Sequence, residues 1–287
     1  MLGIIDFLIA LLFGIVEGIT EWLPISSTGH MILLDRIFKL NVSEDFFSLY
    51  LVVIQLGAIL AVVVLFWGEI WPFGKKNNTK PLTKGGLLSY VDVNKFQMWF
   101  KILVACIPAG IVGVLFDDVL DALLYNYFVV AIALITFGIA FIVVETVKKD
   151  KEPRCKDIKD LTYVDALIIG FFQLISAIFP GTSRSGSTIV GSLMIGVSRE
   201  VAAKFTFFMA VPVMLGASLL KIVKYDGTVS NKELLVLGIG MVSAFLVSIF
   251  VLKFIIGYVK KHDFKVFGWY RIILGVIVIV AFKFILK

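Results

Sequence analysis

Two carboxylates, four hydroxyls and an imidazole fall within the fourteen residues 17–30 of the sequence. Glu17 and Glu21 are four residues apart, so on a helix both side chains project from one face. Such a pair chelates a divalent cation, or its mutual repulsion separates the two groups into a base and an electrostatic partner. The spacing leaves both interpretations open. The alternative without chemistry is an interfacial helix with two solvated carboxylates.

The hydroxyl and imidazole groups follow directly after the carboxylates. Ser26, Ser27 and Thr28 each suit the N-cap of a helix. If Ser27 is the cap, His30 lies one turn further along, on a similar face. A lone histidine in a helix is more often structural, but its neighbours here form a candidate set of nucleophile and base. We therefore predict Ser27 as a nucleophile, with His30 or Glu21 accepting its proton.

A second polar cluster surrounds an arginine in an otherwise apolar stretch. It consists of Ser183, Arg184, Ser185, Gly186, Ser187 and Thr188. Small and hydroxyl residues permit close backbone approach, and a helix N-terminus beside an arginine is well suited to phosphate oxygens. The alternative is a structural salt bridge from Arg184 to Glu17 or Glu21. That salt bridge would still place the two clusters in one site.

The surroundings of both clusters are strongly apolar. The chain has 287 residues, of which 60% are hydrophobic and 17% charged, and its mean hydropathy is +1.00. A water-soluble protein of this length would need more polar surface, so lipid must be the solvent for most of the chain. The net charge of +6 lies in loops between apolar runs, which favours membrane orientation over nucleic-acid binding. Charges within the membrane are costly and usually functional, which favours a role for both clusters.

Six apolar runs are long enough to cross a bilayer, which requires about 20 apolar residues per helix. They cover approximately 47–70, 99–116, 126–147, 200–223, 232–256 and 268–286. Two further stretches, approximately 3–34 and 163–197, are interrupted by proline, glycine and hydroxyl residues at 23–29 and 179–186. Broken backbone is tolerated at membrane depth only where it is buried in protein or lines a wet cavity. We therefore predict two re-entrant helix hairpins.

The two interrupted stretches resemble each other at a constant offset of 156 residues. The matched pairs are Gly14 with Gly170, Glu17 with Gln173, Pro24 with Pro180 and Ser27 with Ser183. Each stretch is followed by three predicted spans, an odd number that turns the second copy upside down. We predict an all-α polytopic membrane protein, a single domain over 1–287 with inverted repeats at approximately 1–147 and 160–287. We expect Gln173 to hydrogen-bond across the hairpins.

Positive charges gather in three loops that fall on one side of this arrangement. They are Lys75, Lys76, Lys80, Lys84 and Lys95, then Lys148, Lys149, Lys151, Arg154, Lys156 and Lys159, then Lys260, Lys261 and Lys265. The positive-inside rule makes this side cytoplasmic, and it places a loop with Asp117, Asp118 and Asp121 outside. Both termini then lie outside, and the two hairpins enter from opposite faces. The tryptophans, Trp22 among them, mostly end apolar runs, as interfacial aromatics do.

Both clusters resemble the signatures of a known family. Residues 17–30, EGITEWLPISSTGH, and residues 180–188, PGTSRSGST, are similar to the two motifs of the undecaprenyl-diphosphate phosphatases linked to bacitracin resistance. The resemblance extends from end to end and implies an inverted-repeat fold with an outward-facing site at the hairpin tips. It implies functional positions at Glu17, Glu21, Ser27, His30, Ser183, Arg184 and Thr188. The implied location is the bacterial cytoplasmic membrane, with undecaprenyl (C55) diphosphate hydrolysed to undecaprenyl phosphate and inorganic phosphate. This reaction would recycle the carrier lipid for peptidoglycan synthesis and blunt bacitracin.

The resulting hypothesis gives each cluster a task. The catalytic set is Glu17, Glu21, Ser27 and His30, and the diphosphate-binding set is Ser26, Thr28, Ser183, Arg184, Ser185, Gly186, Ser187 and Thr188. Glu17 and Glu21 either bind a divalent cation, Mg²⁺ or Ca²⁺, or tune the base. A metal-activated water is the alternative nucleophile to Ser27. The competing class is a transporter or flippase of an anionic or polyisoprenyl phosphate substrate, with proton-coupling carboxylates. A homodimer is left open.

Overall fold

The computed structural model describes residues 3–74, 78 and 80–285 and consists of helices joined by turns and loops. Its helices are α1 (Ile4–Thr20), α2 (Ser27–Ile37), α3 (Glu44–Leu65), α4 (Trp67–Ile70), η1 (Leu87–Tyr90), α5 (Val93–Leu124), α6 (Tyr127–Val147), η2 (Ile158–Asp160), α7 (Tyr163–Ile178), α8 (Arg184–Met194), α9 (Arg199–Lys224), α10 (Asn231–Val259), α11 (Lys265–Val280) and η3 (Ala281–Ile285).

Six helices of the described part are long and apolar enough to cross a membrane. They are Glu44–Leu65, Val93–Phe116, Tyr127–Val147, Arg199–Lys224, Asn231–Val259 and Lys265–Phe284. The prediction of six spans is therefore confirmed, and the chain is a multi-pass membrane protein. Several boundaries differ by a few residues because capping groups set them. Ser43 caps α3 and Ser230 caps α10, each by accepting a hydrogen bond from a backbone N–H in the first turn.

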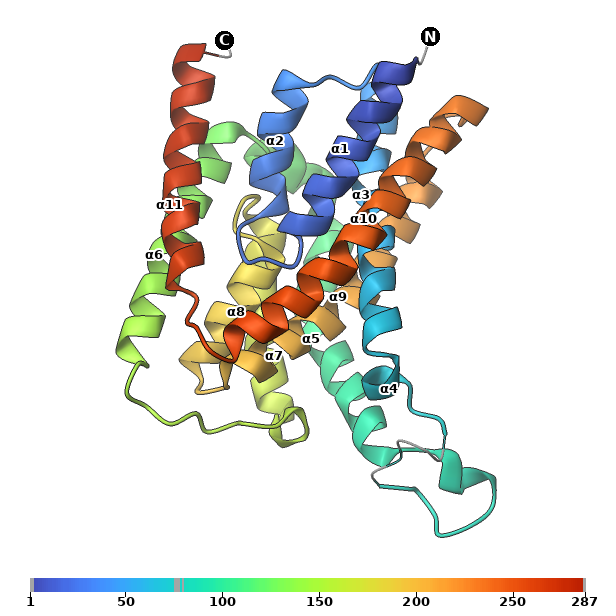
Figure 1. The fold of residues 1–287 in the computed structure, drawn as a ribbon, viewed down its shortest axis with the longest axis vertical. Coiled ribbons are helices and arrows are strands. Elements are labelled where there is room, and N and C mark those ends of the chain that lie inside the picture. The colour runs from blue at the N-terminus through green and yellow to red at the C-terminus, as the bar shows by residue number, and fades with distance from the viewer. Residues whose placement is uncertain (1–2, 75–77, 79, 286–287) are drawn as a thin grey trace.

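Each interrupted stretch forms two helices, as predicted. The turn between α1 and α2 covers residues 21–26, and the turn between α7 and α8 covers residues 179–183. Figure 1 shows the α1–α2 hairpin opening toward the end of the molecule where both termini lie, and α7–α8 opening toward the opposite end. The turns of the two hairpins approach each other in the interior. The described parts of the loops at 72–92 and 148–162 lie at the end away from the termini (Figure 1). Lys75 and Lys76 fall outside the described residues.

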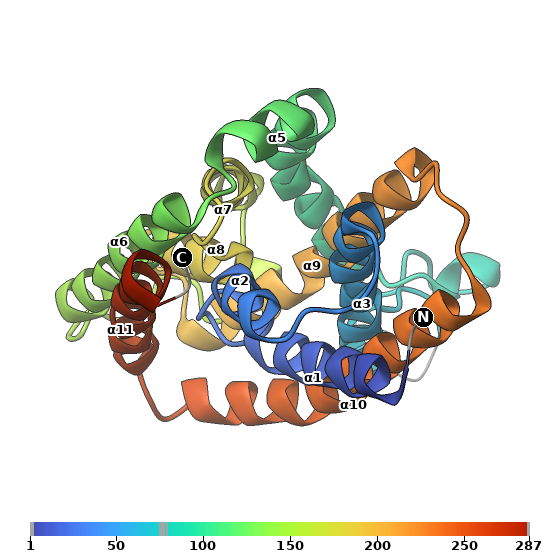
Figure 2. The same cartoon turned by 90° about the horizontal axis from the view of Figure 1, so that it is seen from above.

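Close helix contacts hold both hairpins. A Cβ on Gly14 of α1 would lie 2.4 Å from the carbonyl oxygen of Gly240 in α10, and a Cβ on Gly170 of α7 would lie 2.4 Å from that of Ala105 in α5. Small residues of this kind let membrane helices approach closely. Viewed from above, α1 runs along α10 and α7 lies beside α5, while α2 and α8 occupy the centre (Figure 2).

Two predictions about individual segments are wrong. Asp117, Asp118 and Asp121 belong to α5 and not to a loop, because no helix breaker follows the apolar run before Asn126, which caps α6. Trp22 is not interfacial. Its side chain is fully buried and packs edge-on against Phe207 of α9, with ring centroids 5.4 Å apart. A tryptophan at the end of an apolar run can therefore pack in the protein interior as well as at the membrane surface.

Candidate active site

The two central helices begin in the same unusual way. Ser26 precedes α2 and Ser183 precedes α8, and each side chain accepts a hydrogen bond from the backbone N–H three residues on, at 3.4 and 3.1 Å. Their φ angles are 72° and 69°, and they are the only non-glycine residues with positive φ in the described chain. Such backbone strain is found mainly at functional sites. Of the three candidate caps, Ser26, Ser27 and Thr28, it is Ser26 that caps α2, which leaves the Ser27 hydroxyl available for another partner.

That partner is the carboxylate of Glu21. The Ser27 hydroxyl donates to Glu21 Oε2 at 3.0 Å, and Arg184 Nη2 donates to Glu21 Oε1 at 2.9 Å. The side chains of Arg184 and Glu21 are only 12% and 8% exposed. One carboxylate thus joins a hydroxyl of the first hairpin to a guanidinium of the second, and the second polar cluster meets the first as predicted.

Further contacts fix the second turn against the first. The Ser185 hydroxyl donates to the Glu21 carbonyl oxygen at 3.2 Å and lies 3.2 Å from the Ser183 hydroxyl. Arg184 Nη1 donates to the carbonyl oxygen of Thr206 in α9 at 2.9 Å, which orients its guanidinium. The N-terminus of α8 therefore faces Glu21 with an arginine and two serines, a group of donors suited to an anion.

Glu17 completes the acidic side of the site. It is 1% exposed, its side chain interacts with that of Glu21, and its Oε1 has no hydrogen-bond partner among the described residues. An orphaned carboxylate oxygen next to a second carboxylate fits a divalent cation. Within the described chain there is no group of three histidine, cysteine or acidic side chains that could hold a metal. A cation here would therefore need further oxygen ligands from substrate or water, which suits Mg²⁺ in phosphate sites.

Gln173, the counterpart of Glu17, does not behave as predicted. Both of its side-chain polar atoms are buried and lack a hydrogen-bond partner in the described residues. Its expected hydrogen bond across the hairpins is therefore absent from this part of the chain. The amide belongs to α7, which packs mainly on α5, whereas Glu17 belongs to α1, which packs mainly on α10. The two matched positions therefore have different neighbours.

His30 contacts the Ser26 backbone and Tyr270 of α11. Its Nδ1 lies 2.7 Å from the Ser26 carbonyl oxygen and its Nε2 lies 2.7 Å from the Tyr270 hydroxyl, with the two rings stacked. Because a carbonyl oxygen only accepts, the ring proton belongs on Nδ1, and Nε2 accepts from Tyr270. The two hydrogen bonds occupy both ring nitrogens. Of the two predicted bases, Glu21 is the one in contact with Ser27.

The remaining predicted positions lie near the starts of α8 and α2. The hydroxyls of Ser187 and Thr188 donate to the Arg184 carbonyl oxygen at 3.1 and 2.8 Å, and both residues are fully buried. Thr188 also lies 2.9 Å from the Thr206 hydroxyl. Their hydroxyls support α8 from within. Thr28 is half-buried in the first turn of α2, next to Ser27.

Sequence reasoning missed two residues of α11. Tyr270 contacts His30, and Arg271 donates hydrogen bonds to the carbonyl oxygens of Pro24, Gly181 and Thr182. The available signal was Arg271 itself, a charge inside the apolar run 268–286, since charges within spans are usually functional.

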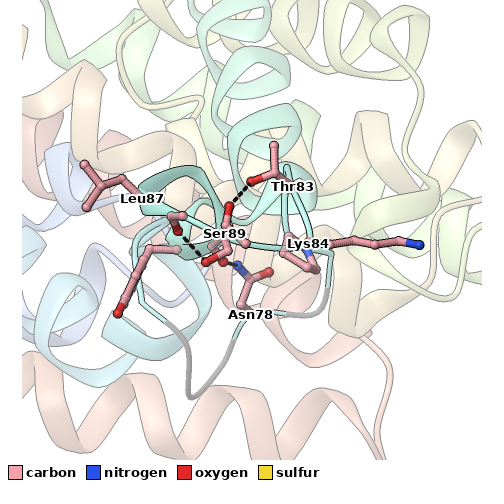
Figure 3. A pocket seen from close by; sticks show the side chains of 9 residues that line it. Asn78, Thr83, Lys84, Leu87 and Ser89 are labelled. Carbon is pink, nitrogen blue, oxygen red and sulfur yellow. Dashed lines mark hydrogen bonds between the residues drawn. The ribbon is translucent and has the colours of Figure 1, made fainter.

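A hollow of about 590 Å³ lies elsewhere, in the loop between α4 and α5 (Figure 3). Asn78, Thr83, Lys84, Leu87 and Ser89 contribute to its wall, and Lys84 points outward from it. Hydrogen bonds within this one segment, such as Asn78 Nδ2 to the Ser89 carbonyl oxygen at 3.0 Å, shape it. It contains none of the predicted site residues and is a feature of the loop.

Known proteins resemble this chain over nearly its whole length. The family model described as bacitracin resistance protein BacA matches residues 10–277. The chain belongs to the BacA family. An undecaprenyl-diphosphatase of Desulfitobacterium hafniense is 57% identical over 98% of this chain and 98% of its own. Undecaprenyl-diphosphatase 1 of Clostridium acetobutylicum is 56% identical and the Enterococcus faecalis enzyme 54%, each over 97% of this chain and 98% of its own. The BacA match confirms the family that the two motifs indicated.

Proposed function

We propose that this BacA-family chain is a membrane hydrolase that converts undecaprenyl diphosphate to undecaprenyl phosphate and inorganic phosphate. One observation carries the proposal: Glu21 binds the Ser27 hydroxyl and the Arg184 guanidinium at once, inside a chain more than half identical to undecaprenyl-diphosphatases. A nucleophile, its base and an anion-binding arginine are the groups that phosphoryl transfer requires. The reaction would return the carrier lipid to peptidoglycan synthesis and oppose bacitracin.

The first step is attack of Ser27 Oγ on the terminal phosphorus of the diphosphate. Glu21 Oε2 takes the hydroxyl proton, the bond from phosphorus to the bridging oxygen breaks, and undecaprenyl phosphate leaves with the bonding electrons. Water then attacks the phosphoserine, releases inorganic phosphate and restores Ser27. The alternative mechanism is direct attack by water on the terminal phosphorus, with Glu21 as the base. Glu21 is favoured over His30 as the base because Tyr270 already occupies His30 Nε2.

Arg184 and the start of α8 bind the diphosphate in this scheme. The guanidinium now held by Glu21 Oε1 would turn its donors toward phosphate oxygens, while Thr206 keeps it in place. The N–H groups of the first turn of α8 and the hydroxyls of Ser183 and Ser185 add neutral donors. The developing negative charge of the transition state thus meets fixed donors in a site from which water is largely excluded.

A divalent cation, Mg²⁺ or Ca²⁺, fits beside Glu17 and Glu21. The free Oε1 of Glu17 and the adjacent Glu21 carboxylate would hold it together with substrate oxygens. When bound, the ion would neutralise part of the diphosphate charge. The alternative role for Glu17, without a cation, is to tune the base: repulsion between the two carboxylates would favour transfer of the Ser27 proton to Glu21.

The membrane arrangement we propose has two re-entrant hairpins in inverted repeats, approximately 1–147 and 160–287, of one domain. Three features support it: the hairpins open toward opposite ends (Figure 1), Ser26 and Ser183 share an unusual cap, and Gly14 and Gly170 make matching close contacts. With the lysine-rich loops cytoplasmic, both termini lie outside and the site opens outward. A homodimer stays a prediction.

Phosphate release from the purified protein in detergent tests the activity, because transport is impossible there. Wild-type protein with undecaprenyl diphosphate should release phosphate, and Arg184→Ala should lower kcat/KM at least about 100-fold through loss of a charge-assisted contact to the transition state. Opposing hairpins are also a transporter architecture. If the protein moved the lipid across sealed vesicles without releasing phosphate, the proposed phosphatase activity would be wrong and a flippase would be the better assignment.

A further inference from the structure

Arg271 of α11 is a charged side chain with no exposed surface. It is fully buried, and among the described residues it forms no ion pair. Burying an arginine without a carboxylate partner is costly unless its donors are used well. Its Nη1 and Nη2 donate to backbone carbonyl groups of the two hairpin turns of the site, while its buried Nε has no hydrogen-bond partner among the described residues.

The guanidinium connects the two turns directly. Nη1 donates to the Pro24 carbonyl oxygen at 3.2 Å, in the turn between α1 and α2. Nη2 donates to the carbonyl oxygens of Gly181 and Thr182 at 3.1 and 2.6 Å, in the turn between α7 and α8. These turns are more than 150 residues apart in the sequence, and each ends at one of the strained serine caps. A rigid planar group therefore sets the separation of the two turns.

The contact is also shaped by its neighbours. A Cβ on Gly186 would lie 2.7 Å from Arg271 Nη1, so the absence of a side chain there admits the guanidinium. The ring of Phe137 in α6 covers it at 6.0 Å from the ring centroid. Arg271 is thus held between the α8 N-terminus and α6.

We propose that Arg271 is a positioning residue for the phosphatase reaction, which holds the turn carrying Ser27 in register with the turn carrying Arg184. This inference rests on the proposed function. A lysine retains the charge, but its single ammonium cannot span both turns with the planar geometry of a guanidinium. Arg271→Lys should therefore keep the positive charge and lose the connection between the two turns.

The experiment combines turnover with hydrogen exchange of the purified full-length protein in detergent. Arg271→Lys should lower kcat about 100-fold while KM for undecaprenyl diphosphate changes less than about threefold, because a misplacement near 1 Å is costly to the chemical step. Amides of residues 21–29 and 179–187 should exchange faster together, with the rest of the chain unchanged. If the lysine variant does not fold, Arg271→Gln is measured in the same way.

A matched control is Arg199→Lys. Arg199 forms a bidentate ion pair with buried Glu145, at 2.9 and 2.5 Å, and none of its hydrogen bonds in the described structure goes to either turn. This variant should lower thermal stability and leave kcat within about twofold of wild type, since distant sites act independently. A kcat of Arg271→Lys within about threefold of wild type, or faster exchange at one turn only, overturns the proposal. Wild-type protein that releases no phosphate contradicts the proposed function instead, and the exchange data still decide the role of Arg271.

Discussion

The Ser27 hydroxyl donates to Glu21 Oε2 at 3.0 Å across the turn that joins α1 to α2. The two residues are six positions apart, and the chain between them leaves helical geometry so that this contact can form. A hydroxyl becomes a useful nucleophile when a base is within hydrogen-bond reach. Glu21 is in reach here, while the nitrogens of His30 are occupied by Ser26 and Tyr270.

Glu21→Gln should abolish most turnover and preserve the fold. The amide keeps the shape of the side chain but cannot accept the Ser27 proton, and it weakens the contact to Arg184. General-base removal typically costs a factor of about 10² to 10⁴, so we expect kcat to fall by at least about 10³. Phosphate release under saturating substrate measures it.

Glu152→Gln is the matched control. Its side chain is 86% exposed and pairs only with Lys156 in the described structure. Exposed ion pairs contribute little, so kcat should remain that of the wild type. Glu21→Gln with kcat within about tenfold of wild type would remove Glu21 from the role of base.

Ser26 and Ser27 are adjacent serines with different tasks, and alanine should separate them. Ser27→Ala removes the nucleophile, so turnover should fall at least about 10³-fold without loss of thermal stability. Ser26→Ala removes the α2 cap, so the free energy of unfolding should fall by about 1 kcal/mol. Its effect on turnover should be far smaller than that of Ser27→Ala. Turnover and thermal unfolding of both variants decide the assignment.

The control for the cap is Ser198→Ala. Ser198 caps α9 through the Val201 N–H and lies outside the site. Its loss should lower the free energy of unfolding by about 1 kcal/mol with unchanged kcat.

A Ser27→Ala protein that turns over normally would contradict Ser27 as the nucleophile and favour water as the attacking group.

These adjacent serines also mark where sequence reasoning stops. The chemistry of Ser26 and Ser27 is identical, so composition and spacing could not decide which one caps α2. The backbone decides, because Ser26 adopts a φ of 72° that turns its hydroxyl toward the Gly29 N–H. That angle depends on packing of the whole hairpin and leaves no trace in the local pattern.

Features set by hydrophobic length were predictable. The six spans and the two interruptions follow from counting apolar residues against the bilayer, and the meeting of Arg184 with Glu21 follows from the cost of isolated charges in lipid. Tyr270 and Arg271 were not predicted, because their partners lie about 90 to 250 residues away and only the packing of α11 brings them together. Local spacing carries no information on such contacts.

Glu17→Gln should weaken binding of the proposed divalent cation. The substitution removes the Glu17 carboxylate from the proposed cation site and keeps the Glu21 carboxylate. A chelator should stop turnover of the wild type, and added Mg²⁺ or Ca²⁺ should restore it. For Glu17→Gln, the cation concentration at half-maximal rate should rise at least about tenfold, since second carboxylates contribute strongly to such sites.

Glu44→Gln serves as the control for Glu17, because it removes a carboxylate from the exposed start of α3. Its cation dependence should match the wild type. Full activity of the wild type in excess chelator would exclude the cation and leave Glu17 as an electrostatic partner of Glu21 only.

Tyr270→Phe should lower kcat/KM about fivefold. The change removes one hydrogen bond, worth about 1 kcal/mol, from His30 Nε2 and keeps the stacked ring. His30 then anchors the start of α2 less firmly, and Ser27 lies in that first turn. Tyr258→Phe is a matched control, because Tyr258 also stacks on a histidine, His262, in the loop after α10. If His30 were instead the base for Ser27, the loss of Tyr270 would free Nε2 and raise the rate, so the sign of the change distinguishes an anchoring histidine from a catalytic one.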